Sequence, residues 1–144
     1  MGSIKQRVTF IDPPSWLFQD RLVESMERVA SHYDKRLRRV VFNFVSREKI
    51  REINVVHLKH DYDTDVITFE YCKSNIIEGD VFLCTDVIRD NAIDLEVDAH
   101  TETLRVLFHG LLHLIGFNDK TSTDKAQMRS EEDRCLQMFE NENG

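Results

Sequence analysis

Four segments of the chain have the pattern of hydrophobic and polar positions that is typical of β-strands. Each is short, is rich in Val, Ile, Phe or Thr, and is bounded by polar or turn-forming residues. The predicted strands are RVTFID (7–12), RVVFNFV (39–45), VITFEY (66–71) and GDVFLCT (79–85). The polar segment HLKHDYDTD (57–65) predicts a turn before the third strand, and we expect Gly79 and Asp80 to turn into the fourth.

Between and after these strands, apolar residues recur three or four positions apart, which places them on one face of an α-helix. The predicted helices begin at Ser15, Ser46, Thr85 and near Thr101, and the last one covers 122–139. Ser15 and Ser46 can cap the helices that follow them, because a serine side chain accepts a hydrogen bond from a free backbone N–H. Gly116 suits the left-handed residue that ends a helix, so the helix that begins near Thr101 should end there.

Four strands interleaved with about five helices predict a mixed α/β (α+β) fold built on one four-stranded mixed sheet. No repeat, low-complexity tract or linker rich in Gly, Pro or Ser interrupts the sequence, so we expect a single domain over residues 1–144. The connections at 45–66 and 71–79 leave the order of the strands open.

The composition is that of a soluble globular protein, with 41% hydrophobic and 31% charged residues among 144. No run reaches the roughly 18 apolar residues that span a bilayer, and the N-terminus lacks the apolar stretch of a secretory signal. These features predict a cytoplasmic protein. Cys72, Cys84 and Cys135 are widely spaced, and we expect them to be reduced, buried packing residues rather than disulfides.

The net charge of −7, taken alone, argues against a polyanionic partner, but the charge is unevenly distributed. Residues 1–60 hold 12 Lys and Arg against 7 Asp and Glu, whereas residues 61–144 hold 7 against 19. The segments KRLRR (35–39) and REKIR (47–51) supply most of the positive charge. They permit a basic binding surface on an acidic protein, although an ordinary solvated surface is the simpler explanation.

The segment HGLLHLIGFND (109–119) contains the candidate chemistry of the chain. His109 and His113 are four residues apart on the predicted helix, so both imidazoles can reach one metal ion. Asp119 follows the helix end and can approach the ion from another direction. Two histidines, one carboxylate and a water describe an open catalytic zinc site. A buried helix whose histidines bond to their neighbours explains the same spacing, and residue chemistry alone leaves both interpretations open.

In the helix-borne zinc motif H-E-x-x-H, a glutamate directly after the first histidine acts as the general base. Gly110 occupies that place here, so the metal helix is zincin-like in its histidine spacing while the pattern disfavours a peptidase. The catalytic residues other than the metal ligands stay unassigned.

Three segments resemble the YbeY endoribonucleases, bacterial enzymes that mature ribosomal RNA. FHGLLHLIGFND (108–119) is similar to the family signature H-G-x-L-H-L-x-G-Y-D-H. NVVHLKHDYDTDVITFEY (54–71) resembles the family segment N-x-x-Y-R-x-K-D-x-P-T-D-V-L-S-F, and GDVFLCTDVIRDNA (79–92) resembles its G-D-I-x-I-S segment. The resemblance covers roughly residues 50–120 in the right order and spacing, and the family's length and mixed α/β fold agree with the whole chain.

This resemblance implies a ligand set for one zinc ion per chain, or for another divalent metal. His109 and His113 match the family's first two metal-binding histidines, and Asp119 takes the place of the third. A carboxylate is an accepted zinc ligand, but it should make the bound water less acidic. It also favours harder ions such as manganese.

Other positions match the family pattern or depart from it. Those that match are Thr64, Asp65, Gly79 and Asp80, where an active-site role competes with turn and cap roles. Leu58 stands where the family has an arginine thought important for RNA cleavage. The neighbouring Lys59 could supply the charge but lacks the planar fork of a guanidinium, and Asp63 replaces the family's proline.

The resemblance implies a single-strand-specific, metal-dependent endoribonuclease that acts at the 3′ end of small-subunit ribosomal RNA and in ribosome quality control. Its expected partners are ribosomal RNA and the small ribosomal subunit, with no membrane or DNA. Basic side chains around 35–59 would hold the RNA backbone. One alternative is a non-catalytic ribosome assembly factor with a structural metal, which Leu58 favours. Another is a metal-dependent hydrolase of a different substrate, which the acidic total favours.

Overall fold

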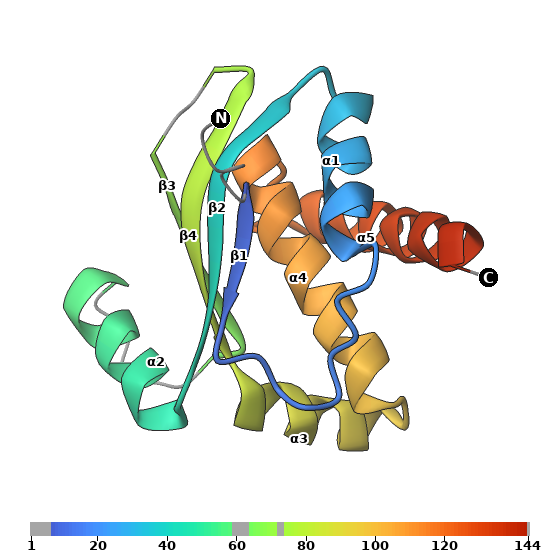
Figure 1. The fold of residues 1–144 in the computed structure, drawn as a ribbon. Coiled ribbons are helices and arrows are strands. Elements are labelled where there is room, and N and C mark those ends of the chain that lie inside the picture. The colour runs from blue at the N-terminus through green and yellow to red at the C-terminus, as the bar shows by residue number, and fades with distance from the viewer. Residues whose placement is uncertain (1–6, 59–63, 72–73, 144) are drawn as a thin grey trace, which may run out of the picture.

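A four-stranded sheet with helices on both faces forms the framework of the molecule (Figure 1). The computed structural model describes residues 7–58, 64–71 and 74–143. Its strands are β1 (Val8–Ile11), β2 (Arg36–Val45), β3 (Val66–Glu70) and β4 (Ile76–Cys84), in the order β1-β2-β4-β3. β1, β2 and β4 run parallel, and β3 pairs antiparallel with β4 at one edge. The predicted mixed α/β fold and its mixed sheet are confirmed.

The described part of the chain contains five α-helices and one π-helical turn. They are α1 (Leu22–His32), α2 (Arg47–Ile53), the π-helical η1 (Asn54–Leu58), α3 (Thr85–Leu95), α4 (Ala99–Ile115) and α5 (Ser122–Asn143). Figure 1 shows α1, α4 and α5 on one side of the sheet and α2 on the other. Within the described residues, no helix combines the length and apolar character that crossing a membrane requires.

The larger hydrophobic core lies between the sheet and the helices α1 and α4. Its fully buried side chains include Leu22, Met26, Phe42, Leu83, Phe108 and Leu111. A smaller core beneath α2 contains Ile50, Ile53, Ile67 and Cys84. Because helices cover parts of both faces, the second half of each central strand is largely apolar, VVFNFV in β2 and VFLC in β4.

The ends of two helices follow from the residue types around them. Asp98 caps α4, because its carboxylate accepts a hydrogen bond from the Thr101 backbone N–H at 2.7 Å. The helix therefore begins slightly before the predicted Thr101. Gly116 ends α4 with a φ of 132°, as predicted, in a conformation that residues with a β-carbon rarely adopt. Ser46 caps α2 as predicted, accepting a hydrogen bond from the Lys49 backbone N–H at 3.1 Å.

The helix start predicted at Ser15 is wrong. α1 begins only after Arg21, which has a left-handed conformation and makes no capping hydrogen bond with its side chain. The segment before it packs against the core instead. Leu17 is buried there, and the Trp16 indole donates a hydrogen bond to the Thr103 hydroxyl of α4 at 3.0 Å. These tertiary contacts override a capping signal that depends only on local sequence.

Gly79 lies inside β4, so the turn predicted at Gly79 and Asp80 is wrong. Gly79 is paired with neighbours on both β2 and β3. A β-carbon at position 79 would lie 2.5 Å from the backbone oxygen of Phe69 and 2.8 Å from the Leu114 side chain of α4. Glycine is therefore required here by the close approach of a strand and a helix. β2 and β4 both begin before their predicted starts, because backbone pairing continues past the apolar residues that marked them.

Replacing Gly79 by alanine should destabilise the protein by about 3 kcal/mol, because the backbone oxygen in contact with the new methyl group cannot move aside. Gly110→Ala is a matched control in the same interface. Its methyl group would lie 2.9 Å from the Val81 side chain, and the three nearest atoms all belong to side chains and not to the backbone, so its cost should be smaller. Urea denaturation of both variants measures the difference. Equal stability of Gly79→Ala and the parent protein would contradict this account of the packing.

Cys84 and Cys135 are buried free thiols, as predicted. Burial raises the pKa of the Cys135 thiol to about 12, so this side chain packs without being reactive at neutral pH. Cys72 lies outside the described residues.

Candidate metal centre

Three side chains singled out by the sequence, those of His109, His113 and Asp119, point their polar atoms at one another. The His109 and His113 Nε2 atoms lie 3.0 Å apart. The Asp119 Oδ2 atom lies 3.4 Å from the Nε2 atom of His109 and 3.3 Å from that of His113. Because Gly116 ends α4, the following segment returns over the helix end. One helix and the segment after it thus supply all three atoms.

The spacing of these atoms fits a divalent metal ion. Zinc lies about 2.0–2.2 Å from nitrogen and carboxylate ligands, so two ligands of a tetrahedral zinc lie about 3.3 Å apart. The three separations fall within a few tenths of an ångström of that value. Two imidazoles and one carboxylate are also the donor types of open zinc sites. His109, His113 and Asp119 could therefore hold a metal ion.

The second nitrogen of each ring has a partner that keeps both Nε2 atoms directed toward Asp119. The His109 Nδ1 atom lies 2.6 Å from Glu132 Oε2 on α5, and the His113 Nδ1 atom lies 3.0 Å from the backbone oxygen of Phe117. In each pair the imidazole can donate its Nδ1–H to an oxygen, which leaves the Nε2 lone pair for a metal. Proteins commonly orient metal-binding histidines in this way.

Glu132 also connects His109 to a second α4 side chain, that of Arg105. The Arg105 guanidinium donates hydrogen bonds to Glu132 at 3.0 Å and to Asp133 at 2.7 Å. The Arg105 side chain is 17% exposed and that of Glu132 only 7%. A buried carboxylate that accepts hydrogen bonds from a guanidinium and an imidazole is held in one position. The contacts from Arg105 through Glu132 therefore fix the orientation of the His109 ring.

The surroundings of the two histidines shift their pKa values in opposite directions. Burial lowers the pKa of His109, but the hydrogen bond and charge of Glu132, with the charge of Asp119, raise it overall. Burial, followed by the charge of His109, lowers the pKa of His113. His113 therefore favours the neutral imidazole, which is the form that binds metals.

A cleft of about 250 Å³ opens beside His109 and Asp119. Its charged lining comes from Asp65, Glu102, Asp119, Glu132, Arg105 and Arg129. Glu102 is 6% exposed, and its carboxylate has no hydrogen bond or ion pair with any other described residue. Burial, followed by the charge of Asp65, raises the pKa of Glu102, and burial also raises the pKa of Asp65. The cleft thus contains carboxyl groups suited to proton transfer.

Asp65 is the family-matched residue that reaches this cleft. Its carboxylate also accepts hydrogen bonds from its own backbone N–H and from that of Val66, so it caps the start of β3 as well. Asp80 does not line the cleft, and it accepts a hydrogen bond from the Tyr71 hydroxyl at 2.6 Å. Thr64 is half-buried, two residues before the start of β3.

Apart from Asp119, the departures from the family pattern lie in the segment 57–65. Leu58 ends η1, so the first part of this predicted turn is π-helical, and the Leu58 side chain is exposed. Lys59 and Asp63 lie outside the described residues.

Sequence interpretation did not identify four of the charged cleft residues. Glu102 and Arg105 precede His109 by seven and four positions, and so they share its face on an otherwise largely apolar helix. Charged residues on the histidine face of an apolar helix were therefore a usable signal for the site. Arg129 and Glu132 offered none, because Glu132 reaches His109 from 23 residues further along the chain through the packing of α5 on α4.

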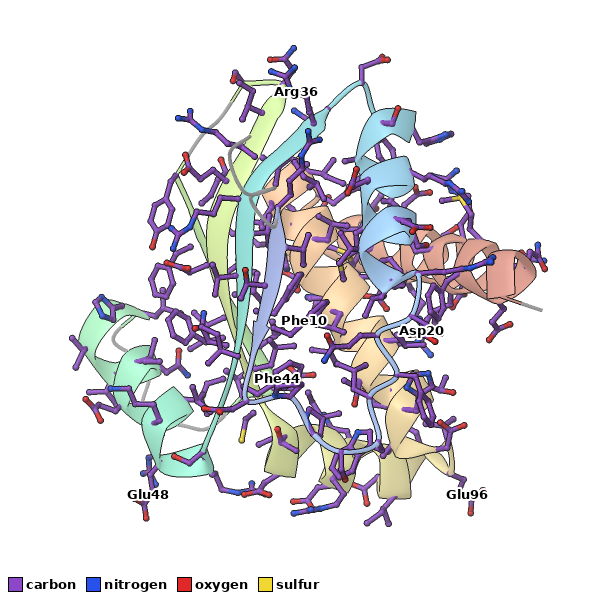
Figure 2. The ribbon with its side chains drawn as sticks, viewed as in Figure 1. Phe10, Asp20, Arg36, Phe44, Glu48 and Glu96 are labelled. Atoms are coloured by element: carbon purple, nitrogen blue, oxygen red, sulfur yellow. The ribbon has the colours of Figure 1, made fainter. Side chains whose placement is uncertain are left out.

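The two basic segments of the sequence lie on different parts of the molecule. Lys35 shares a small cleft with Gly116 and Phe117, directly after the end of α4. Arg36 lies at the end of the sheet that is uppermost in Figure 2. Arg47, from the second segment, begins α2 on the opposite face of the sheet. The first basic segment is therefore the one that approaches the end of the histidine helix.

The chain is similar to known proteins in sequence and in fold. A family model described as Endoribonuclease YbeY matches residues 15–140. A protein of Bacteroides thetaiotaomicron named Endoribonuclease YbeY is 43% identical over 115 residues, which cover 80% of this chain and 84% of that protein. A protein of the same name from Phocaeicola vulgatus is 41% identical over 114 residues, covering 79% and 83%. The solution structure of a Thermotoga maritima protein has a similar fold, with a TM-score of 0.66 and 22% identity over 94% of this chain and 90% of that one.

Proposed function

The chain belongs to the YbeY family of endoribonucleases, which are hydrolases, and on this premise we propose that it is a metal-dependent endoribonuclease specific for single strands. Its substrate in this proposal is ribosomal RNA, at the 3′ end of the small-subunit RNA. The activity serves ribosomal RNA maturation and ribosome quality control in the cytoplasm, with the small ribosomal subunit as partner. The observation that carries the proposal is the convergence of His109, His113 and Asp119 beside an open cleft.

In this proposal His109, His113 and Asp119 are the protein ligands of one divalent ion per chain. Zinc is the expected ion, because the donor types and their spacing suit it. Manganese is the alternative, because a carboxylate ligand favours harder ions. When bound, the ion supplies Lewis-acid chemistry to a phosphodiester.

The remaining residues of the site position groups and handle protons. Glu132 and the Phe117 backbone oxygen hold the two rings so that both Nε2 atoms face the ion. Glu102 and Asp65 are the proton acceptors in this proposal. Their carboxyl groups line the same cleft, and burial raises the pKa of each toward the range in which a carboxylate can take up a proton.

The dimensions and surroundings of the cleft support a single-stranded substrate. A cleft of about 250 Å³ is small, and a scissile phosphate reaches it more easily on a splayed strand than within a duplex. Lys35, beside Gly116 and Phe117, can contact a neighbouring phosphate of the same strand.

The test of this function is a cleavage assay on single-stranded RNA, duplex RNA, and generic phosphodiester and ester substrates. The purified protein should cleave the single strand, lose that activity in a chelator and regain it with added zinc or manganese. Tight binding to the small ribosomal subunit without turnover would instead support an assembly factor. Turnover of an ester or a small phosphodiester, with RNA left intact, would support a hydrolase of another substrate.

A further inference from the structure

The charges of the cleft raise a problem for the proposed RNA substrate. Four carboxylates line it, from Asp65, Glu102, Asp119 and Glu132, against two guanidiniums, from Arg105 and Arg129. A phosphodiester carries a negative charge, and desolvated carboxylates nearby would repel it. One divalent ion offsets part of this charge. Binding of an RNA strand then requires a cation from the protein that is free to face the phosphate.

Arg105 is not free for this purpose. Two of its guanidinium nitrogens donate hydrogen bonds to Glu132 and Asp133, at 3.0 and 2.7 Å. The side chain is largely buried, and its contact with Glu132 is part of the support for the His109 ring. Turning Arg105 toward a ligand would take the guanidinium away from the buried Glu132 carboxylate, which costs more than a phosphate contact returns.

Arg129, unlike Arg105, has an exposed side chain. Its side chain, on α5, is 58% exposed. Its nearest carboxylate oxygen is Glu132 Oε1 at 3.9 Å, beyond hydrogen-bonding distance, and that oxygen already accepts a hydrogen bond from Arg105. The other oxygen of Glu132 lies 2.6 Å from the His109 Nδ1 atom. A single carboxylate group, that of Glu132, thus separates the exposed Arg129 guanidinium from the His109 ring.

We propose that Arg129 is the phosphate-binding residue of the cleft, donating from its guanidinium to a non-bridging oxygen of the RNA backbone beside the metal centre. The planar fork of arginine matches two phosphate oxygens, and its long side chain can reach the ligand without disturbing Glu132. This inference rests on the proposed function, because that function supplies the phosphodiester. It places substrate recognition on α5, which contributes none of the three candidate metal ligands.

The experiment compares Arg129→Gln, Arg129→Lys and Arg89→Gln with the parent protein. Arg89, on α3, is 49% exposed and does not line the cleft, and its replacement by glutamine removes the same charge. Binding of a short 2′-O-methyl RNA strand to zinc-loaded protein is followed by fluorescence anisotropy, after the strand has been shown to stay intact. Cleavage of unmodified RNA is measured in parallel, with His113→Ala as the inactive reference.

Arg129→Gln should bind the strand about 10- to 100-fold more weakly, which is the range of a charge-assisted hydrogen bond, and should raise KM more than it lowers kcat. The slope of log affinity against log salt should fall by about 0.7, the value of one phosphate contact on a single strand. Arg129→Lys should keep the slope and lose part of the affinity. Arg89→Gln should change the affinity less than about twofold.

Two results would separate this inference from the proposed function. If Arg129→Gln bound RNA no more weakly than Arg89→Gln, the inference would be overturned, whatever the cleavage assay showed. If the parent protein failed to cleave RNA but Arg129→Gln still lost affinity and salt dependence, phosphate binding by Arg129 would stand and the endoribonuclease proposal would fail.

Discussion

Replacing His113 by alanine should abolish metal binding and lower RNA cleavage by at least about a thousandfold, while the protein stays folded. His113 contributes one of the three converging atoms, and two remaining ligands from His109 and Asp119 do not form a stable site. The side chain is partly exposed, and its Nδ1 atom is hydrogen-bonded to the Phe117 backbone oxygen at 3.0 Å. Losing that hydrogen bond should cost only about 1 kcal/mol.

The measurements are initial cleavage rates on single-stranded RNA and thermal unfolding of the metal-free proteins. His32→Ala is the control, since His32 is an exposed histidine in the last turn of α1, outside the metal cleft. It should cleave like the parent. RNA cleavage by a metal-free His113→Ala protein at a rate near that of the parent would exclude the metal-dependent mechanism.

Glu132→Gln should weaken metal binding by about 10- to 100-fold, although Glu132 is not itself one of the converging ligands. The amide cannot accept both the His109 Nδ1–H and the Arg105 guanidinium as a charged carboxylate does. The His109 ring then loses its fixed orientation and part of its basicity. Because both partners of Glu132 are largely buried, the variant should also lose about 2–3 kcal/mol of folding stability.

Asp133→Asn is the matched control for this prediction. Asp133 accepts a hydrogen bond from the same Arg105 side chain at 2.7 Å, but it is 59% exposed and does not contact His109. Its replacement should cost less than about 1 kcal/mol and leave metal affinity unchanged. Competition with a chromophoric chelator and urea denaturation give the two quantities. If Glu132→Gln held the metal as tightly as Asp133→Asn, the orienting role of Glu132 would be wrong.

Local sequence signals predicted the elements of this fold well wherever the local and tertiary preferences agree. The α4 helix is an example, because its apolar face, its polar start and Gly116 all indicate the same helix. Ser15 is the counterexample. Its capping potential is real, but burial of Leu17 and the contact of Trp16 with α4 stabilise a non-helical path. Strand order could not be predicted, since it depends on pairings between distant segments.

The same distinction between local and tertiary signals applies to the residues of the candidate site. His109, His113 and Asp119 could be found from sequence, because one helix and the residues after its end hold all three. Glu132 and Arg129 could not, because they enter the site only when α5 packs against α4. Gly79 shows the same limit, since its sequence context indicates a turn and only the packed structure shows how closely Leu114 approaches it.

The central claim is that these three residues bind a catalytic metal ion, and metal content tests it most directly. Untagged protein, prepared without chelator and supplied with zinc, would be analysed by mass spectrometry beside His113→Ala and Asp119→Ala. The account predicts about one equivalent of zinc or manganese in the parent protein and almost none in either variant. A parent protein free of metal, or variants that retain the full equivalent, would contradict it.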